Sequence, residues 1–176
     1  MKKIFVLCTL ALFSSACGRR YAEEKPPEAE SKEELLKVSQ AMVHKEAEDI
    51  NEFIKRHQWT MTETGSGLRL AIYQQGSGRT PASGDTVSIA YKAYLLDGTL
   101  CYEKKTEQPE RFALGNGEQI NGLEEALAMM KEGAAAHVIV PSHLAYGLSG
   151  DGNKIPPARA IYFNLQLLNV ENHSTR

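Results

Sequence analysis

The hydrophobic pattern of this chain changes its period near residue 67, and this change constrains the fold more than any other feature. Over residues 31–57 apolar residues recur every three or four positions, which is typical of an amphipathic helix. Beyond residue 67, apolar and polar residues alternate, as in Leu68, Leu70 and Ile72, which is typical of a strand with one buried face. The sequence therefore predicts one helix followed by a domain built mainly of strands.

The second region contains further strands and one more helix. Alternation predicts a long strand over 87–95, and Asp97-Gly98 predicts the turn that follows it, because both central residues of a type I′ turn need positive φ. Apolar residues with helical spacing predict a short helix between residues 120 and 130. Residues 160–170 alternate again and predict the closing strand. We expect an α+β fold in which an antiparallel sheet of about five strands curls around one short helix, preceded by one amphipathic helix.

The start of the chain resembles an export signal. Lys2 and Lys3 give it a positive end, and the apolar run over residues 4–13 is too short to span a bilayer. Small residues then lead to Cys17. We expect a signal peptide over residues 1–16, removed on export.

Cys17 lies where the lipid-bearing cysteine of a bacterial lipoprotein is expected, although Ser14 occupies the usual leucine position. The alternative is a plain signal peptide cut near Ala16, which would leave Cys17 as a free thiol. Residues 17–30 contain almost no large apolar side chain, so we interpret them as a lipidated cysteine with a flexible tether. The expected location is the periplasmic face of the outer membrane.

The helix predicted over residues 31–57 begins with a capping box formed by Ser31 and Glu34. Its apolar face consists of Leu36, Val43, Ala47, Ile50 and Ile54. Such a face has to be buried, either against the chain's own domain or against a second copy in a homodimer. Residues 58–65 form a connector, 66–171 the strand-rich domain and 172–176 a tail.

Composition argues against several other classes of function. The formal net charge is -2 and no basic patch stands out, so a nucleic-acid partner is not expected. Cys8 lies in the leader, and Cys17 and Cys101 do not form a disulfide framework. The five histidines lack metal-ligand spacing, so neither a metal nor another cofactor is expected.

A series of short motifs occurs in order along residues 66–171. They are Gly84-Asp-Thr-Val, Leu96-Asp-Gly, Phe112-Ala-Leu-Gly, Ile120-Asn-Gly-Leu-Glu-Glu, Met130-Lys-Glu-Gly, Ala145-Tyr-Gly, Ile155-Pro-Pro and Phe163-Asn-Leu-Gln-Leu. No single motif is specific, but together they resemble the FKBP-type peptidyl-prolyl isomerases. The resemblance implies an enzyme without cofactors that acts on proline-containing segments of proteins.

The resemblance also implies a set of site residues around a small apolar pocket for a proline ring. The catalytic positions would be Tyr91, Phe112, Ile120, Tyr146 and Phe163. The substrate-binding positions would be Cys101, Tyr102, Gln119, Leu123 and Ile155. Two donors, the backbone N–H of Ile120 and the hydroxyl of Tyr146, are expected to hold a substrate carbonyl.

Several of these positions depart from the family pattern. Cys101 replaces a pocket aromatic, Tyr102 replaces a carboxylate, Glu110 replaces an apolar or aromatic residue, and Leu123 replaces the aromatic at the pocket floor. We expect a wider, less aromatic pocket that lacks one hydrogen-bond acceptor. Two functions remain open: a prolyl isomerase, and a non-catalytic module that binds a peptide or partner at the membrane.

A narrower resemblance concerns one branch of the family. The stretches 96–102 and 141–148, together with the leader and the first helix, resemble the gliding-motility-associated FKBP lipoproteins. This resemblance implies a role in the folding or assembly of exported proteins with a link to gliding motility.

Overall fold

The computed structural model of the protein describes residues 28–172. The predicted signal peptide, Cys17, the tether up to residue 27 and the end of the tail lie outside these residues. The elements, in chain order, are α1 (Glu28–His57), β1 (Thr62–Glu63), β2 (Arg69–Gln74), β3 (Thr86–Leu95), β4 (Leu100–Lys104), β5 (Glu110–Ala113), α2 (Asn121–Ala128), β6 (Ala135–Val140), a 3-10 helix η1 (Ser142–Leu144) and β7 (Ile161–Glu171).

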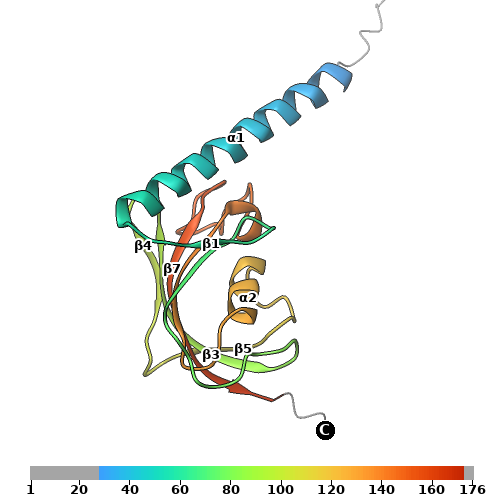
Figure 1. The fold of residues 1–176 in the computed structure, drawn as a ribbon. Helices are drawn as coiled ribbons and strands as arrows, with labels where there is room; N and C mark the ends of the chain where they lie inside the picture. Colours follow the sequence, from blue (N-terminus) through green and yellow to red (C-terminus); the bar gives the residue numbers. More distant parts are fainter. Residues whose placement is uncertain (1–27, 173–176) are drawn as a thin grey trace, which may run out of the picture.

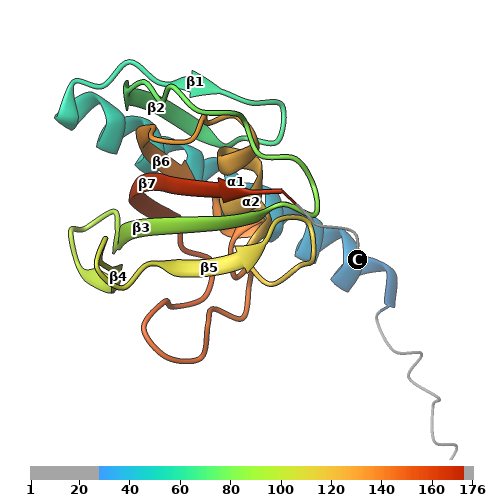
Figure 2. The same cartoon turned by 90° about the horizontal axis from the view of Figure 1, so that it is seen from below.

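The strands form one antiparallel sheet in the order β1-β2-β6-β7-β3-β4, with β5 also paired to β3 (Figure 2). Strand β3 is long enough to pair with two strands along the same edge. Its first half pairs with β5 and its second half with β4, while β7 pairs with it from Thr86 to Leu95 on the other side. The long strands β3 and β7 therefore form the centre of the domain.

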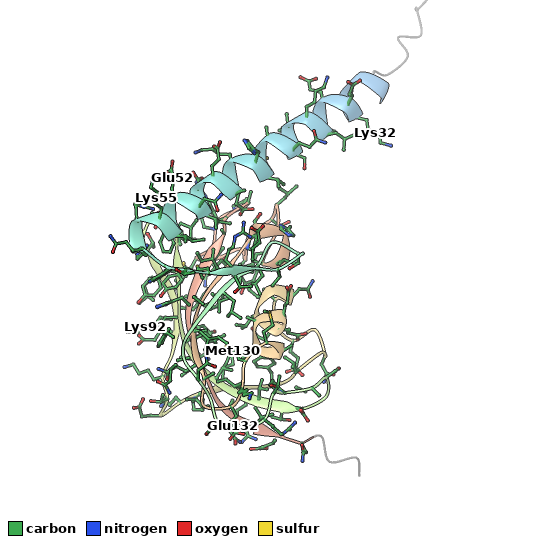
Figure 3. The ribbon with its side chains drawn as sticks, in the orientation of Figure 1. Lys32, Glu52, Lys55, Lys92, Met130 and Glu132 are labelled. Atoms are coloured by element: carbon green, nitrogen blue, oxygen red, sulfur yellow. The ribbon has the colours of Figure 1, made fainter. Side chains whose placement is uncertain are left out.

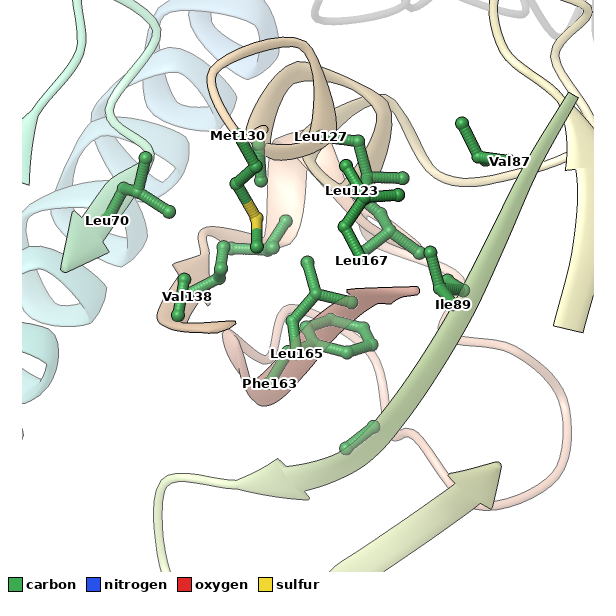
Figure 4. Packing of buried hydrophobic residues seen from close by; sticks show 14 of the residues in the cluster. Leu70, Val87, Ile89, Leu123, Leu127, Met130, Val138, Phe163, Leu165 and Leu167 are labelled. Atoms are coloured by element: carbon green, nitrogen blue, oxygen red, sulfur yellow. The ribbon is translucent and has the colours of Figure 1, made fainter. Parts of the chain in front are cut away.

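The main hydrophobic core lies between the sheet and α2 (Figure 4). Leu123 and Leu127 of α2 and the following Met130 are fully buried against Leu165 and Leu167 of β7. Side chains of β7 alternate between buried and more exposed positions, as the period of two requires. The predicted α+β fold class, a sheet packed around one short helix, is confirmed.

The C-terminal part of α1 packs on the opposite face of the sheet (Figure 1). Ile50 and Phe53 are buried there in a second cluster with Ile139 of β6 and Ala160, and Tyr162 of β7 packs beside them. Charged side chains such as Glu52 and Lys55 are exposed on the outer side of this helix (Figure 3). The chain's own domain thus buries one half of the predicted apolar face.

The N-terminal part of α1 extends beyond the domain (Figure 1). Its apolar side chains are at least half exposed: Leu35, Leu36, Val38, Met42 and Val43. None of the described helices is long and apolar enough to cross a membrane.

The structure differs from the sequence-based boundaries in three places. Helix α1 begins at Glu28, so Ser31 lies within its first turns and does not form an N-cap, because Glu28, Ala29 and Glu30 are compatible with helix. The sheet has seven strands rather than about five, and one of them is the two-residue β1 in the connector. Helix α2 spans Asn121–Ala128 and so ends two residues before the predicted boundary at residue 130.

Candidate functional site

A hydrogen-bonded group of three side chains joins β3, β5 and the segment before α2. The hydroxyl of Tyr91 donates to Oε2 of Glu110 at 2.7 Å, and Nε2 of Gln119 donates to Oε1 of the same carboxylate at 2.8 Å. Strand pairing explains why Tyr91 and Glu110 meet, because Ile89, two residues before Tyr91, lies opposite Glu110. The two carboxylate oxygens of Glu110 thus fix both Tyr91 and Gln119.

The environment of Tyr91 keeps its hydroxyl protonated. Burial raises the pKa of Tyr91 well above its usual value, and the hydrogen bond to Glu110 raises it further. The nearby hydroxyls of Tyr146 and Tyr102 raise this pKa as well, so all three tyrosines lie within electrostatic range of one another. Tyr91 is therefore a neutral group that orients toward a carboxylate at physiological pH.

Phe163 packs against Tyr91 from the neighbouring strand. The two ring centroids are 5.6 Å apart in an edge-to-face arrangement, which is favourable for aromatic pairs. Phe163 lies opposite Ala93 in the β3–β7 ladder, and its side chain is buried. The pair gives the site a rigid aromatic wall.

Tyr146 lies in the segment between η1 and β7. Its side chain is about one-third exposed, and within residues 28–172 its hydroxyl has no hydrogen-bond partner. Burial of part of the ring raises the pKa of Tyr146, and the nearby carboxylates of Asp151 and Glu110 contribute. The hydroxyl is thus a neutral donor next to the Tyr91–Glu110 pair, free to bond to a ligand.

Ile120 supplies a second donor. It is the N-cap residue of α2, with extended backbone, and its carbonyl accepts the first helical N–H groups. No group of the described chain accepts a hydrogen bond from the N–H of Ile120. This N–H is available to a ligand carbonyl, as the resemblance implies.

Tyr102 secures the segment that follows Tyr146. Its hydroxyl donates to Oδ2 of Asp151, and this bond is the main cause that raises the pKa of Tyr102. Oδ1 of Asp151 accepts the N–H groups of Asn153 at 2.9 Å and Ile155 at 2.8 Å. The ammonium of Lys154 lies 5.2 Å from the centre of the Tyr102 ring. Tyr102 therefore holds the turn that carries Ile155.

The remaining predicted site residues lie in the core. Cys101 is 2% exposed, and its single S–H can donate to the carbonyl oxygen of Thr99 or of Lys154, which lie 3.7 and 3.8 Å from Sγ. Burial raises the pKa of this thiol, which makes it unreactive. Phe112, Leu123 and Ile155 are also buried in the main cluster. These buried side chains pack behind the site, and the groups that can make polar contacts with a ligand belong to Tyr91, Ile120 and Tyr146.

Comparison with known proteins places this geometry in a family. The family model described as FKBP-type peptidyl-prolyl cis-trans isomerase matches residues 77–168, more than half of the chain. The chain belongs to this FKBP-type family. The match covers Tyr91, Ile120, Tyr146 and Phe163 and extends from before β3 into β7, whereas α1, β1 and β2 precede it.

Individual relatives agree with this assignment. The probable FKBP-type isomerase FkpA of Neisseria meningitidis is 36% identical over 108 residues, which cover 61% of this chain and 39% of the relative. The FKBP-type 22 kDa isomerase of Escherichia coli is 35% identical over 132 residues, covering 74% and 62%. The chain therefore spans less than two thirds of the length of either relative.

Solved structures share the fold. The crystal structure of FkpA from Escherichia coli matches with a TM-score of 0.65 at 27% identity, covering 86% of this chain and 75% of that chain. A peptidyl-prolyl isomerase from Pseudomonas syringae matches with a TM-score of 0.63 at 26% identity, covering 76% and 96%. The likeness thus covers nearly the full length of the Pseudomonas syringae structure and three quarters of the Escherichia coli structure.

Two site residues of the FKBP-type domain escaped the sequence analysis. The sequence indicated Glu110 only as a departure from the family pattern. In the structure its carboxylate accepts the Tyr91 hydroxyl and so replaces the carboxylate that is absent at position 102. Its position two residues before the buried Phe112 was a usable signal, because residues i and i+2 of a strand share a face. Asp151 lies in a Gly-Asp-Gly turn that carries no comparable signal.

A separate cavity lies on the outer side of the FKBP-type domain. Its volume is about 410 Å³, and its lining includes Phe53, Arg56, Tyr94, Asp97 and Tyr162, between α1 and the β3–β4 turn. It shares no residue with the predicted site. Phe53 and Arg56 of its lining belong to α1, outside the residues that the family model matches.

The substitution Glu110→Gln should lower the pKa of Tyr91. The change removes the negative charge that stabilises the protonated hydroxyl, but burial remains, so the pKa should stay above the usual tyrosine value. The ¹³Cζ shift of Tyr91 followed against pH by NMR measures this, with the exposed Glu107→Gln as the control. An unchanged Tyr91 titration in Glu110→Gln would contradict the assigned hydrogen bond.

The same shift gives stability a defined pH dependence. Because the folded-state pKa of Tyr91 exceeds the unfolded value of about 10, its contribution to stability is complete below that pH and is lost as pH rises.

Proposed function

We propose that this chain is a peptidyl-prolyl cis-trans isomerase that assists the folding or assembly of exported proteins. The observation that carries the proposal is the pair of unengaged donors, the Tyr146 hydroxyl and the Ile120 N–H, beside the packed rings of Tyr91 and Phe163. The substrate class is a protein segment with an exposed Xaa-Pro bond.

The reaction needs positioning and a suitable environment, not a nucleophile. The barrier to rotation about a peptide bond is about 18–20 kcal/mol and comes from amide resonance. A twisted amide has less charge separation than a planar one, so an apolar surface favours it relative to water. Phe163 and the Tyr91 ring supply such a surface, and the two donors hold the carbonyls that flank the rotating bond.

The departures from the family pattern are compensated within this site. Glu110 from β5 replaces the missing carboxylate as acceptor for Tyr91. Tyr102 is not needed as that acceptor, and its hydroxyl donates to Asp151, which stabilises the turn that follows Tyr146. These contacts favour a working isomerase over a module that only binds.

The substitution Tyr146→Phe should lower kcat/KM for an Xaa-Pro tetrapeptide by about fivefold to tenfold, because one hydrogen bond worth about 1 kcal/mol is lost. A coupled prolyl isomerisation assay on the mature chain measures this, with a peptide series that varies the residue before proline. Tyr94→Phe is the matched control, since Tyr94 stacks on Tyr162 on the outer face of the sheet.

Three results are informative in this assay. Activity that is reduced in Tyr146→Phe and unchanged in Tyr94→Phe supports the proposal. Equal activity of parent and Tyr146→Phe would sink the site assignment. A folded parent chain that binds the peptides without accelerating their isomerisation would instead identify the non-catalytic binding module.

We further propose that lipid on Cys17 anchors the chain at the periplasmic face of the outer membrane, where it serves the gliding machinery. The supporting observations are the leader, the small residues before Cys17 and the branch resemblance of residues 96–102 and 141–148. Several acyl chains on one cysteine give stable anchoring.

The substitution Cys17→Ser should move the protein from the membrane fraction to the soluble fraction of its native cells, and it should reduce colony spreading. Fractionation with immunodetection and a spreading assay measure the two effects, with Cys8→Ser as the control. A Cys17→Ser protein that remains in the membrane fraction rules out the anchor, and unchanged spreading rules out the link to motility.

We also propose that the exposed apolar side chains of α1 form a homodimer contact. Contiguous exposed apolar surface of this kind marks interaction sites, and the chain's own domain leaves Leu36, Met42 and Val43 uncovered.

The double substitution Leu36→Glu and Val43→Glu should convert a dimer to a monomer, because it places charges within the apolar contact. Sedimentation equilibrium measures the mass, and Lys32→Glu on the same helix is the control. A parent chain that sediments as a monomer contradicts the proposed dimer.

A further inference from the structure

A carboxylate of α1 binds the start of the segment that carries Tyr146. Oε1 of Glu46 accepts the backbone N–H of Ser142 at 3.0 Å, and Oε2 accepts the Ser142 hydroxyl at 2.9 Å. The two residues are 96 positions apart in the sequence, yet α1 crosses the domain directly beside η1 (Figure 1). Both oxygens of Glu46 are therefore committed to one residue of the loop.

Ser142 in turn fixes the backbone on each side of Tyr146. Its carbonyl oxygen accepts the N–H of Ala145 at 3.0 Å and the N–H of Gly147 at 2.8 Å. Gly147 has φ +58°, a left-handed conformation that glycine adopts without strain. The placement of the Tyr146 side chain thus depends on the position of Ser142.

Glu46 lies on the docked face of α1. Glu46, Ile50 and Phe53 follow the i, i+4, i+7 spacing of one helix face, and the last two are buried against the sheet. One turn earlier, Val43 is already exposed. Among the described residues of α1, Glu46 is the most N-terminal one with a hydrogen bond to the strand-rich domain.

We propose that Glu46 is a positioning residue for Tyr146, so that the docking of α1 sets the geometry of the isomerase site. The contact runs from the Glu46 carboxylate through Ser142 to the backbone on both sides of Tyr146. Helix α1 is thereby a part of the catalytic domain in function, although the family match begins after it. This inference rests on the proposed isomerase activity for its kinetic consequence, but not for its structural one.

The chemistry of the contact requires a side chain at position 46 that can form hydrogen bonds with both the N–H and the hydroxyl of Ser142. The N–H of Ser142 is at the start of η1, where no helical carbonyl can accept it. An ionised carboxylate forms hydrogen bonds roughly twice as strong as neutral acceptors do. Alanine at position 46 would release both bonds, whereas glutamine retains an acceptor for the N–H and an amide group that can donate to the hydroxyl oxygen.

The test compares Glu46→Ala, Glu46→Gln and the exposed control Glu52→Ala in the full mature chain, each with Tyr146 present and in a Tyr146→Phe background. We expect Glu46→Ala to lower kcat/KM by about fivefold with Tyr146 present and by less than about twofold in Tyr146→Phe, because it acts through that hydroxyl. Glu46→Gln should retain most of the activity, and Glu52→Ala all of it.

Amide hydrogen exchange measured by NMR gives a readout that does not depend on activity. Exchange at Ala145 and Gly147 should be faster in Glu46→Ala, and unchanged in Glu52→Ala. An equal kinetic loss in both backgrounds, or unchanged exchange at these two amides, overturns the proposal. If the parent chain has no isomerase activity but exchange changes as expected, the proposed function fails while the structural link from Glu46 to the Tyr146 segment stands.

Discussion

The pairing of β3 with β7 along its whole length, and with β5 along its first half, is the constraint on which the rest of the structure depends. It brings Tyr91 of β3, Glu110 of β5 and Phe163 of β7 together, although they are distant in sequence. A register shift of one residue would reverse the face of every side chain in a strand, so the buried face of β7 also fixes the site. The core and the proposed isomerase site therefore depend on the same strand pairing.

The polar contacts of the site differ from the family pattern, but the Tyr91 hydroxyl still has a carboxylate as its acceptor. A half-buried tyrosine hydroxyl needs an acceptor, because an unpaired buried polar group is costly. Glu110 meets this need for Tyr91 and binds Gln119 as well. Tyr102 is then free to bind Asp151, which orders the turn before Ile155. In this chain β5 supplies the carboxylate that accepts the Tyr91 hydroxyl, because position 102 on β4 is a tyrosine.

The sequence predicted the parts of this account that depend on local pattern. Period-two alternation identified β3 and β7, and the Asp97-Gly98 pair identified the β3–β4 hairpin. The predicted type I′ turn was wrong, because Gly98 has a positive φ but Asp97 does not. The sequence could not show that Glu110 contacts Tyr91, or that Glu46 contacts Ser142. These contacts depend on strand pairing and helix docking between residues that are far apart in the sequence. The sequence also left open how α1 is buried. The structure shows that the apolar face divides, with Ile50 and Phe53 docked and Val43 exposed.

We propose that proline-containing segments bind between Tyr146, the Ile120 N–H and the Tyr91–Phe163 pair. The most direct measurement is an NMR titration of the ¹⁵N-labelled mature chain with an Xaa-Pro tetrapeptide. We expect a saturable downfield shift of the Ile120 amide proton, with changes at Tyr146 and Gln119, because this N–H gains an acceptor when the peptide binds. Shifts confined to the outer cavity around Phe53, Arg56 and Tyr162, with the Ile120 amide unchanged, would contradict it.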